Sequence, residues 1–395
     1  MRSISLINCS ILILVGFFGC GEKKPGTGLS EEIVEIDLSE AREAKLSEFF
    51  QTVSYSLLDY TDELPIVNGY KMVVTKDEIF VESRETAKVF VFDKSGQLKN
   101  VIGQLGDGPG EIRLIDGLFV NGDTVRIDSE YGNKYVLFSK DGKFIKEDKL
   151  SYRASAIYET DFSLYYFQHG EGPDQWTYIR EDKSGDKPGK TEKGYLPLGK
   201  GFEEFNSFAG PIGFLKDPQT GQIFYTEPND YVVQNFDSDG YFKRTIRFDF
   251  GKYNWPMEMR LELAGKGRER NDYLKENPVV SGLYDFFPFQ DLFFMSAGTY
   301  GKTYWIFADK KFTSIDIIQD WENDLDGMKL RQLSWTKSED EIIYSLDSKA
   351  FFNDYKEAFN GMSVESQPGD IHEFFEKNRK KLQEEKIVLV SYKLK

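Results

Sequence analysis

Cysteine and histidine are scarce in this sequence, which has two of each among its 395 residues. A zinc site built on three histidines is therefore excluded, because only His169 and His372 exist. Cys9 and Cys20 both lie within the first 20 residues, so we expect neither to contribute a disulfide or a thiolate metal site to the folded chain. We predict no metal centre and no cofactor.

Basic residues are also in deficit. The chain carries 50 Lys and Arg against 66 Asp and Glu, which gives a formal net charge of −16. A nucleic-acid partner is disfavoured because a phosphate backbone requires a basic face, and an anionic membrane surface is disfavoured for the same reason. Aromatic residues, by contrast, make up 15% of the chain and favour β-strands.

The first residues predict export rather than folded structure. The apolar run Ile4–Phe18 is too short to span a membrane and is typical of a secretory signal, here residues 1–19. Gly19-Cys20 resembles the lipobox of bacterial lipoproteins, in which the cysteine becomes the lipidated N-terminus, although Phe17-Phe18 departs from the usual pattern. An ordinary signal peptide is the alternative.

Residues 20–32 would then form the lipidated Cys20 and a flexible tether. We expect a protein secreted across the inner membrane and lipid-anchored, on the periplasmic side or on the outer-membrane surface. It would touch the membrane only through its lipid anchor. The stretch Gly21–Lys24 lacks a clear acidic export tract, which favours the periplasmic side.

Strand–turn–strand units recur along the rest of the chain. In each, two strand-like runs flank a polar turn that ends in glycine, which is typical of a type I turn closed by a left-handed residue. The four copies are Val89–Ile102, Tyr135–Lys146, Tyr178–Gly185 and Val232–Phe248. Their turn glycines are 46, 43 and 55 residues apart, a period typical of a four-stranded propeller blade.

Two degenerate copies, Asp291–Phe307 and Asp340–Tyr392, bring the number of units to six. An inner strand can be placed before each unit: Tyr70–Val74, Gly117–Val120, Ala156–Glu159, Ile212–Leu215, Tyr284–Phe289 and Leu330–Trp335. The sequence therefore predicts an all-β fold over residues 33–395, a six-bladed β-propeller with four-stranded blades.

The sixth unit ends after three strands, so its outer edge needs a partner from elsewhere in the chain. Val53–Leu57 precedes the first inner strand, and we expect it to close the ring by pairing with Ile387–Tyr392. Ile33–Leu38 is the competing candidate for this pairing. Between these two segments, Ser39–Phe50 is predicted to form a short helix.

Three long insertions interrupt the repeat, and blade topology predicts that all of them lie on one face. Residues 251–282 and Asp186–Gly210 join an outer strand to the next inner strand, whereas residues 349–386 join a second strand to a third. Helices are predicted in the first and last of these, through Trp255, Met259 and Leu263, through Phe351–Phe359, and through Asp370–Leu382. Loops on a rigid scaffold often carry binding function, so we expect ligands on this face. Helices that merely cover the channel mouth are the alternative.

The stretch Gly103–Ile112 contains four glycines and a proline, so it must turn sharply between two strands. We interpret it as a structural loop that sets the spacing of two blades, with the Glu111 carboxylate tied to loop N–H groups. Anion binding by these N–H groups is the alternative. A P-loop is excluded, because no Lys-Ser/Thr pair and no helix follow. The residues of this loop are Gly106, Gly108, Pro109, Gly110 and Glu111.

This corner, the lipoprotein-like start and three Phe-Asp/Ser-x-x-Gly hairpins resemble the six-bladed β-propeller lipoproteins of Bacteroidetes-type bacteria, relatives of the NHL-repeat propellers. The hairpins are Phe92–Gly96, Phe138–Gly142 and Phe236–Gly240. The resemblance covers the chain from roughly Glu32 to its end and implies a propeller in the cell envelope. It implies little chemistry, because that family is largely a set of binding scaffolds.

Two groups of side chains are candidates for function. His169, Glu171 and Asp174 place a histidine beside two carboxylates, which suits acid–base catalysis or a mixed metal site. A histidine that holds its own loop together is the alternative. The second group combines aromatic and cationic side chains of the insertions, which suits carbohydrate or peptide recognition. Its members are Trp255, Arg260, Arg268, Arg270, Tyr355 and His372.

The sequence therefore predicts a monomeric, non-catalytic scaffold that binds a glycan, a peptide or an envelope protein on its insertion-bearing face. The alternative is an envelope hydrolase or lyase that acts on a polysaccharide or peptide through His169 and nearby carboxylates. Calcium-type loops are absent from the sequence, yet a single cation in the central channel stays open.

Overall fold

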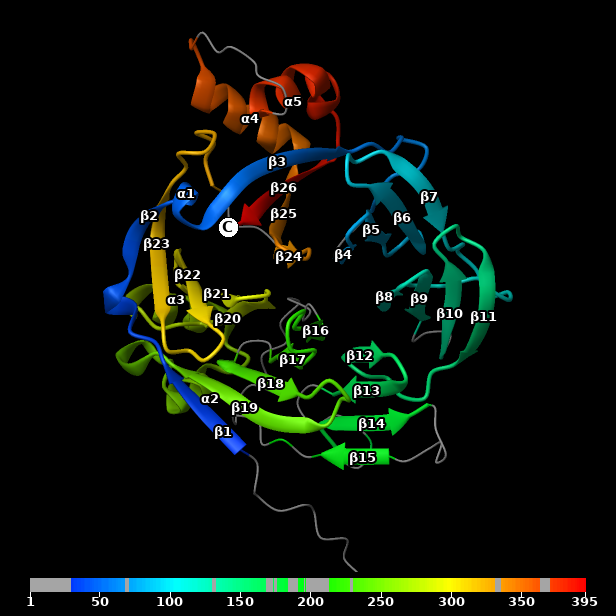
Figure 1. Ribbon diagram of the computed structural model, residues 1–395, viewed down its shortest axis with the longest axis horizontal. Coiled ribbons are helices and arrows are strands. Elements are labelled where there is room, and N and C mark those ends of the chain that lie inside the picture. The colour runs from blue at the N-terminus through cyan, green and yellow to red at the C-terminus, as the bar shows by residue number, and fades with distance from the viewer. Residues whose placement is uncertain are drawn as a thin grey trace, which may run out of the picture.

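The computed structural model describes residues 30–67, 71–129, 133–167, 173, 176–183, 191–194, 196, 213–227, 230–330, 335–362 and 370–395. Six sheets are arranged radially around a central axis, as Figure 1 shows. The predicted six-bladed β-propeller is confirmed, and each sheet contains the expected run of four antiparallel strands.

Blades one to three follow one another along the chain, from the inner strand outward. Blade one is β4 (Met72–Val74), β5 (Glu78–Ser83), β6 (Lys88–Asp93) and β7 (Leu98–Ile102). Blade two is β8 (Gly117–Asn121), β9 (Thr124–Ser129), β10 (Lys134–Ser139) and β11 (Phe144–Lys149). Blade three is β12 (Ala156–Glu159), β13 (Phe162–Tyr166), β14 (Tyr178–Asp182) and β15 (Thr191–Gly194).

The remaining blades also take strands from the N-terminal part of the chain. Blade four is β16 (Leu215–Lys216), β17 (Ile223–Thr226), β18 (Val232–Phe236) and β19 (Phe242–Asp249). Blade five is β20 (Gly282–Pro288), β21 (Leu292–Thr299), β22 (Lys302–Asp309) and β23 (Ile315–Glu322). Blade six contains β24 (Trp335–Lys337), β25 (Glu341–Asp347) and β26 (Ile387–Leu394).

Residues 30–58, the N-terminal belt, run along the outer edges of blades four, five and six (Figure 1). β1 (Ser30–Glu35) adds a parallel fifth strand to blade four, and β2 (Arg42–Lys45) adds one to blade five. β3 (Phe50–Leu58) pairs antiparallel with β26 and becomes the outer strand of blade six. The predicted ring closure by Val53–Leu57 is therefore confirmed, whereas the competing Ile33–Leu38 segment lies against blade four.

The helix predicted over Ser39–Phe50 is wrong. This segment contains the end of η1 (Leu38–Glu40), then β2, then the single turn α1 (Leu46–Phe49). The Arg42 guanidinium donates to Asp316 of β23 with an Nε–Oδ1 distance of 3.0 Å. Pairing with the open edge of blade five, together with the ion pair to Asp316, therefore outweighs the local helix propensity of these residues.

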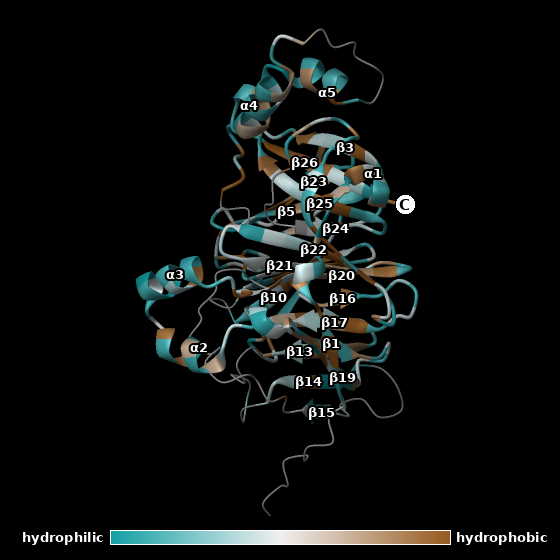
Figure 2. Cartoon of the chain, turned by 90° about the vertical axis from the view of Figure 1, so that its left-hand side faces the viewer, coloured by the Kyte–Doolittle hydropathy of each residue, from teal (hydrophilic) through white to brown (hydrophobic). Residues whose placement is uncertain are grey.

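The helical insertions lie at two places on the ring. η4 (Gly251–Tyr253), α2 (Met257–Leu263) and α3 (Gly267–Glu276) lie between β19 and β20 and project from one face (Figure 2). α4 (Ser348–Phe359), α5 (Ile371–Asn378) and η5 (Lys381–Gln383) lie between β25 and β26 and extend beyond the rim of blade six (Figure 2). Among the described residues, no helix is both long and apolar enough to cross a membrane.

The rim helices pack on the belt rather than over the channel mouth. The ring of Tyr55 on β3 lies 5.4 Å from the ring of Phe351 on α4 and 5.5 Å from that of Phe374 on α5. Asp347 and Asp370 cap these helices by accepting hydrogen bonds from N–H groups of their first turns.

Apolar clusters join neighbouring blades around the ring. The largest joins blades five and six and buries Phe50, Trp305 and Tyr392. The cluster between blades two and three is much smaller, with Ile157, Tyr165, Phe167 and Ile179 as its buried members. The ring is therefore held mainly by burial of apolar surface, and the junction of blades two and three depends least on it.

The outermost hairpins turn as the sequence predicts. Gly96, Gly142 and Gly240 close the third-to-fourth-strand turns of blades one, two and four with φ angles of 87°, 80° and 81°. In blade one, Asp93 Oδ1 accepts hydrogen bonds from the N–H groups of Ser95 and Gln97. The register of each hairpin shifts by one residue beside its turn, which marks the expected bulge.

Gly96→Ala is expected to lower the free energy of unfolding by roughly 2–4 kcal/mol. A Cβ atom at this position would lie 2.1 Å from the Leu57 carbonyl oxygen of β3, so the substitution strains the turn and displaces the ring-closing strand. Urea denaturation measures the loss. Gly122→Ala is the matched control, because Gly122 also has a positive φ but has no atom within 4 Å of such a Cβ. Equal losses in the two variants would contradict a role for the contact with β3.

Candidate functional site

A cavity of about 770 Å³ occupies the centre of the ring. Its wall is formed by the inner strands β4, β8, β12, β16 and β24, by the turns that follow them, and by residues of β9, β10 and β11 in blade two. Adjacent strands of a blade are antiparallel, so these turns lie on the face opposite to the connections that carry the helices. The cavity therefore reaches the face with short turns, and none of the insertion residues that the sequence analysis favoured for binding lines it.

The charge of the cavity wall is opposite in sign to that of the whole chain. Two of its described lining residues, Glu159 and Glu339, are acidic. Seven are basic: Lys71, Lys76, Arg126, Lys146, Lys183, Lys216 and Lys337. In a chain with a formal net charge of −16, this concentration of cations makes the cavity a local site of positive potential.

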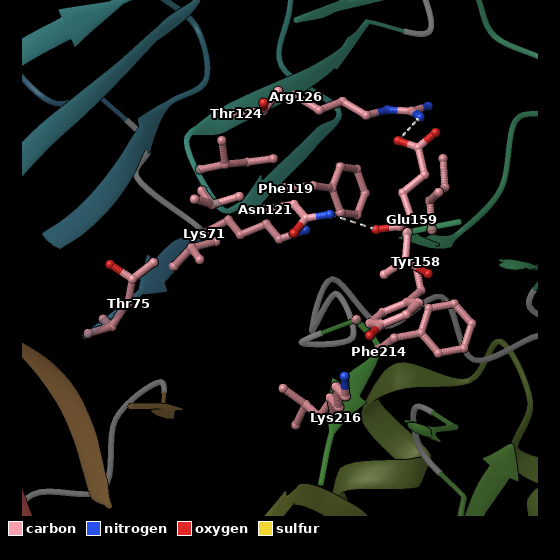
Figure 3. A pocket seen from close by; sticks show the side chains of 18 of the residues that line it. Lys71, Thr75, Phe119, Asn121, Thr124, Arg126, Tyr158, Glu159, Phe214 and Lys216 are labelled. Carbon is pink, nitrogen blue, oxygen red and sulfur yellow. Dashed lines mark hydrogen bonds and ion pairs between the residues drawn. The ribbon is translucent and has the colours of Figure 1, made fainter. Parts of the chain in front are cut away.

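Arg126 of β9 is fixed between two blades. Its Nε donates to Asp128 Oδ1 at 2.6 Å, and its Nη1 donates to Glu159 of β12 in blade three (Figure 3). Lys183 also makes an ion pair with Glu159, so this carboxylate is shared by two cations. The guanidinium lies 4.2 Å from the centroid of the Tyr135 ring. These contacts make Arg126 a rigid part of the wall and replace apolar packing at the junction of blades two and three.

Lys71, next to β4, is a cation of the wall without a close counter-ion among the described residues. Its ammonium lies 4.6 Å from the centroid of the Phe119 ring, and no carboxylate oxygen of the described residues lies within 4.0 Å of it. Burial lowers the pKa of Lys71, while the carboxyl groups of Glu82 and Asp128 raise it from a distance. A partly desolvated ammonium without a close counter-ion is a favourable partner for an anion.

Glu82 offsets this charge only in part. The side chain is buried on β5, and burial raises its pKa to about 7 against the opposing effects of Lys71 and Arg84. At neutral pH about half of the Glu82 carboxyl groups are therefore protonated. Glu82 therefore neutralises the Lys71 ammonium less than a fully ionised carboxylate would.

A second cationic group stands at the junction of blades five and six. Lys337 of β24 donates a hydrogen bond to the carbonyl oxygen of Pro288, and its ammonium lies 4.9 Å from the centroid of the Phe289 ring. Nearby, Lys310 makes an ion pair of 2.8 Å with the buried Asp217. Lys337 therefore borders a neutralised pair but has no ion-pair partner among the described residues.

An aromatic pair completes the wall between blades three and four. The rings of Tyr158 and Phe214 lie 6.3 Å apart and almost perpendicular to each other, and both line the cavity (Figure 3). Lys216 lies beside them. The cavity thus combines cations with flat apolar surfaces, which suits a ligand that has an anionic group and a ring face.

The described residues do not form a metal site. No group of three His, Cys, Asp or Glu side chains in the described part of the chain could hold an ion. The channel cation that the sequence left open is disfavoured by the basic wall, because like charges repel it.

The sequence-predicted catalytic group cannot be placed. His169, Glu171 and Asp174 lie outside the described residues, as does Cys20, the predicted lipidation site. The hydrolase or lyase alternative therefore stays a prediction.

The predicted binding residues of the insertions lie away from the cavity, and several are part of the packing. Trp255 and Arg260 are buried, and the Arg260 guanidinium lies 4.6 Å from the centroid of the Tyr231 ring. Arg268 is exposed on α3, and Arg270 is partly buried there. The structure does bring Tyr355 and His372 together, with a distance of 2.8 Å between Oη and Nδ1. This contact joins α4 to α5.

The glycine-rich corner is held by its own side chains. Glu111 Oε2 accepts a hydrogen bond from the Gly108 N–H at 2.8 Å, and Gln104 donates to Glu111 Oε1 at 3.1 Å. A Cβ at Gly106 would lie 2.1 Å from Glu111 Oε2, so the carboxylate fills the space inside the loop. This occupancy fits the structural interpretation of Gly106, Gly108, Pro109, Gly110 and Glu111.

The comparisons with known proteins agree with this architecture. A crystal structure of a protein from Bacteroides fragilis NCTC 9343 assigned as exported superposes with a TM-score of 0.67 at 16% identity, over 92% of this chain and 99% of that chain. A member of the DUF4221 family from Bacteroides vulgatus ATCC 8482 gives a TM-score of 0.51 at 12% identity, over 88% and 97% of the two chains. At these identities the likeness shows the fold alone.

The curated proteins include no match to the sequence. A family model, described as "Domain of unknown function (DUF4934)", matches residues 32–394. This range includes all six blades and nearly all of the belt, and the chain therefore belongs to that family.

Proposed function

We propose that this protein is a cell-envelope binding scaffold whose central cavity holds an acidic saccharide. The observation that carries the proposal is the Lys71 ammonium, which faces a cavity with seven basic and two acidic described lining residues and has no described carboxylate within 4.0 Å. A carboxylate or sulfate group of the ligand would supply the missing counter-ion.

The shape of the cavity supports a small ligand or the end of a chain. Its volume of about 770 Å³ lies within the range of roughly 300–1,000 Å³ that is usual for small-molecule sites. The aromatic pair Tyr158 and Phe214 offers ring faces to the apolar side of a sugar, close to Lys216. An extended peptide lacks such a ring face at most positions, so the saccharide is favoured.

Electrostatics supports selectivity as well as affinity. The excess negative charge of the chain repels anions from most of its surface, whereas the cavity attracts them. Arg126 is already paired with Asp128 and Glu159, so it shapes the wall, and wall cations without a described ion-pair partner, Lys71 among them, are left to meet the ligand. Binding should weaken as salt is added, because screening reduces these interactions.

Lys71→Met is expected to weaken binding of an acidic oligosaccharide at least roughly tenfold, because a charged hydrogen bond contributes about 1.5–3 kcal/mol. Methionine keeps an unbranched apolar stem over Phe119 and removes the charge. Isothermal titration with galacturonate oligomers, a sulfated disaccharide and a neutral oligomer of equal length measures the change.

Lys275→Met, on α3, is the matched control and should bind as the unchanged protein does. Two results would reject the proposal. One is equal affinity for the acidic and neutral oligomers, and the other is equal affinity of Lys71→Met and the unchanged protein.

The envelope location and the anchor belong to the same proposal. Residues 1–19 would direct export, and Cys20 would carry the lipid that holds residues 20–32 as a tether. The likeness to an assigned exported protein supports secretion. Mass spectrometry of the mature N-terminus tests the anchor. An unmodified N-terminus, whether it begins after Cys20 or elsewhere, would exclude it.

A further inference from the structure

Lys337 differs from the other cations of the cavity in what surrounds it. It is half-buried on β24 and lines the cavity wall. Its hydrogen bond goes to a neutral group, the carbonyl oxygen of Pro288, and the ring of Phe289 lies below its ammonium. Surface lysines such as Lys349, by contrast, pair with carboxylates in water.

The charged groups that act on Lys337 are Lys310 and Asp217. They make an ion pair of 2.8 Å with each other, and Asp217 also accepts hydrogen bonds from the N–H groups of Gln219 and Thr220. Asp217 is therefore engaged, and it gives Lys337 little stabilisation as an ammonium ion. Within the described part of the chain, Lys337 has no carboxylate within 4.0 Å.

This environment favours the neutral amine. Burial and, to a smaller extent, the Lys310 ammonium lower the pKa of Lys337 to about 8, and Asp217 opposes both effects. A lysine in water keeps nearly all of its amine protonated at pH 8, whereas about half would be free here. A free amine beside a cavity is the arrangement that lysine nucleophiles use with carbonyl compounds.

We propose that Lys337 is a covalent capture site for an anionic aldehyde or ketone held in the cavity. The Lys337 nitrogen attacks the carbonyl carbon, the carbonyl oxygen takes a proton, and loss of one water molecule leaves an imine. The step consumes no oxidant or reductant, and water reverses it. The inference rests on the proposed function, because the other cations of the wall bring the anionic carbonyl compound to the amine.

The test uses pyridoxal 5′-phosphate as an anionic aldehyde and the full mature chain. Borohydride reduces any imine to a stable secondary amine, and peptide mass spectrometry then gives the labelling rate of each lysine between pH 6.5 and 9. Lys337 should be labelled at least tenfold faster than Lys275 at pH 7.5, with a half-maximal rate near pH 8. The ratio of the Lys337 and Lys275 labelling rates is measured in the unchanged protein, so it tests the capture site even if a variant fails to fold.

Two further arms separate this inference from the proposed function. Lys337→Arg keeps the positive charge but has no nucleophilic amine, so it should lose the fast label. The affinity of the unchanged protein for the galacturonate oligomer reports the proposed function separately. Pyridoxal without its phosphate should label Lys337 more slowly than the phosphorylated probe does. Equal labelling rates for the two probes would contradict recruitment of the probe by its negative charge. They would still be consistent with Lys337 as a nucleophile. A Lys337 rate no higher than that of Lys275, in a protein that binds the acidic oligomer, would overturn the capture site and leave the proposed function standing.

Discussion

Phe50→Ala is expected to lower the free energy of unfolding by roughly 3–5 kcal/mol, the usual loss for a large aromatic side chain removed from a core. Phe50 is fully buried at the start of β3, where the N-terminal belt enters blade six. Its ring centroid lies 5.3 Å from that of Tyr392 on β26 and 6.4 Å from that of Trp305 on β22. One side chain thus joins the belt to two blades at the place where the ring closes.

Denaturant unfolding followed by tryptophan fluorescence measures this loss. Phe144→Ala is the matched control, because the same side chain is 48% exposed on β11 of blade two and supports no ring closure. We expect the control to lose well under about 1 kcal/mol. A Phe50 variant as stable as the Phe144 variant would contradict the closure of the ring through β3.

Glu227→Gln is expected to reduce the pH dependence of stability. The pKa of Glu227 is raised to about 8, mainly by burial, against the hydrogen bond from Tyr166 and with a smaller contribution from Asp230. The folded-state value lies above the ordinary value of 4.5, so the native protein holds this proton more tightly than the unfolded chain does. The stabilisation is therefore fully present below about pH 4.5 and is lost as the pH rises through about 8.

Each pKa unit corresponds to about 1.4 kcal/mol, so the unchanged protein should lose on the order of 4 kcal/mol through this group between pH 5 and pH 9. Glutamine cannot ionise and still offers an oxygen to the Tyr166 hydroxyl. The free energy of unfolding of Glu227→Gln should therefore fall less over this range. Glu385→Gln, whose side chain is 86% exposed, should follow the unchanged protein. Parallel pH profiles for all three proteins would show that Glu227 is not buried as an acid.

The blades could be predicted because their signals are local. The carboxylates of Asp93 and Asp237 accept hydrogen bonds from N–H groups only a few residues further along the chain, within the same glycine-containing turn. Ring closure could be predicted by counting, since the sixth unit lacked an outer strand and Val53–Leu57 had the right place and pattern. Both inferences needed only the order of elements along the chain.

The belt shows where local signals fail. Arg42–Lys45 consists of good helix formers, yet it is a strand because blade five offers an open edge and Asp316 offers a counter-charge. These partners lie more than 270 residues away in the sequence. Propensity contributes a few tenths of a kcal/mol per residue, so a row of ladder hydrogen bonds outweighs it.

The cationic cavity could not be predicted for the same reason. Lys71, Arg126 and Lys337 come from three blades and are brought together only by closure of the ring. One signal was available: Arg126 and Asp128 interrupt a strand whose other central residues are apolar, and charges in a buried strand usually have a partner or a ligand. The sequence analysis predicted binding on the insertions because they are long and rich in aromatic residues. In the structure, however, Trp255 and Arg260 are buried.

The most direct test of the cationic cavity is the position of a bound anion. Crystals soaked in sodium bromide give anomalous peaks at each bromide, and this halide has no preference for a saccharide or any other ligand class. Peaks beside the Lys71 and Lys337 ammonium groups inside the ring are the expected result. Bromide bound only on the outer rim or at the helical insertions, with none in the cavity, would contradict it.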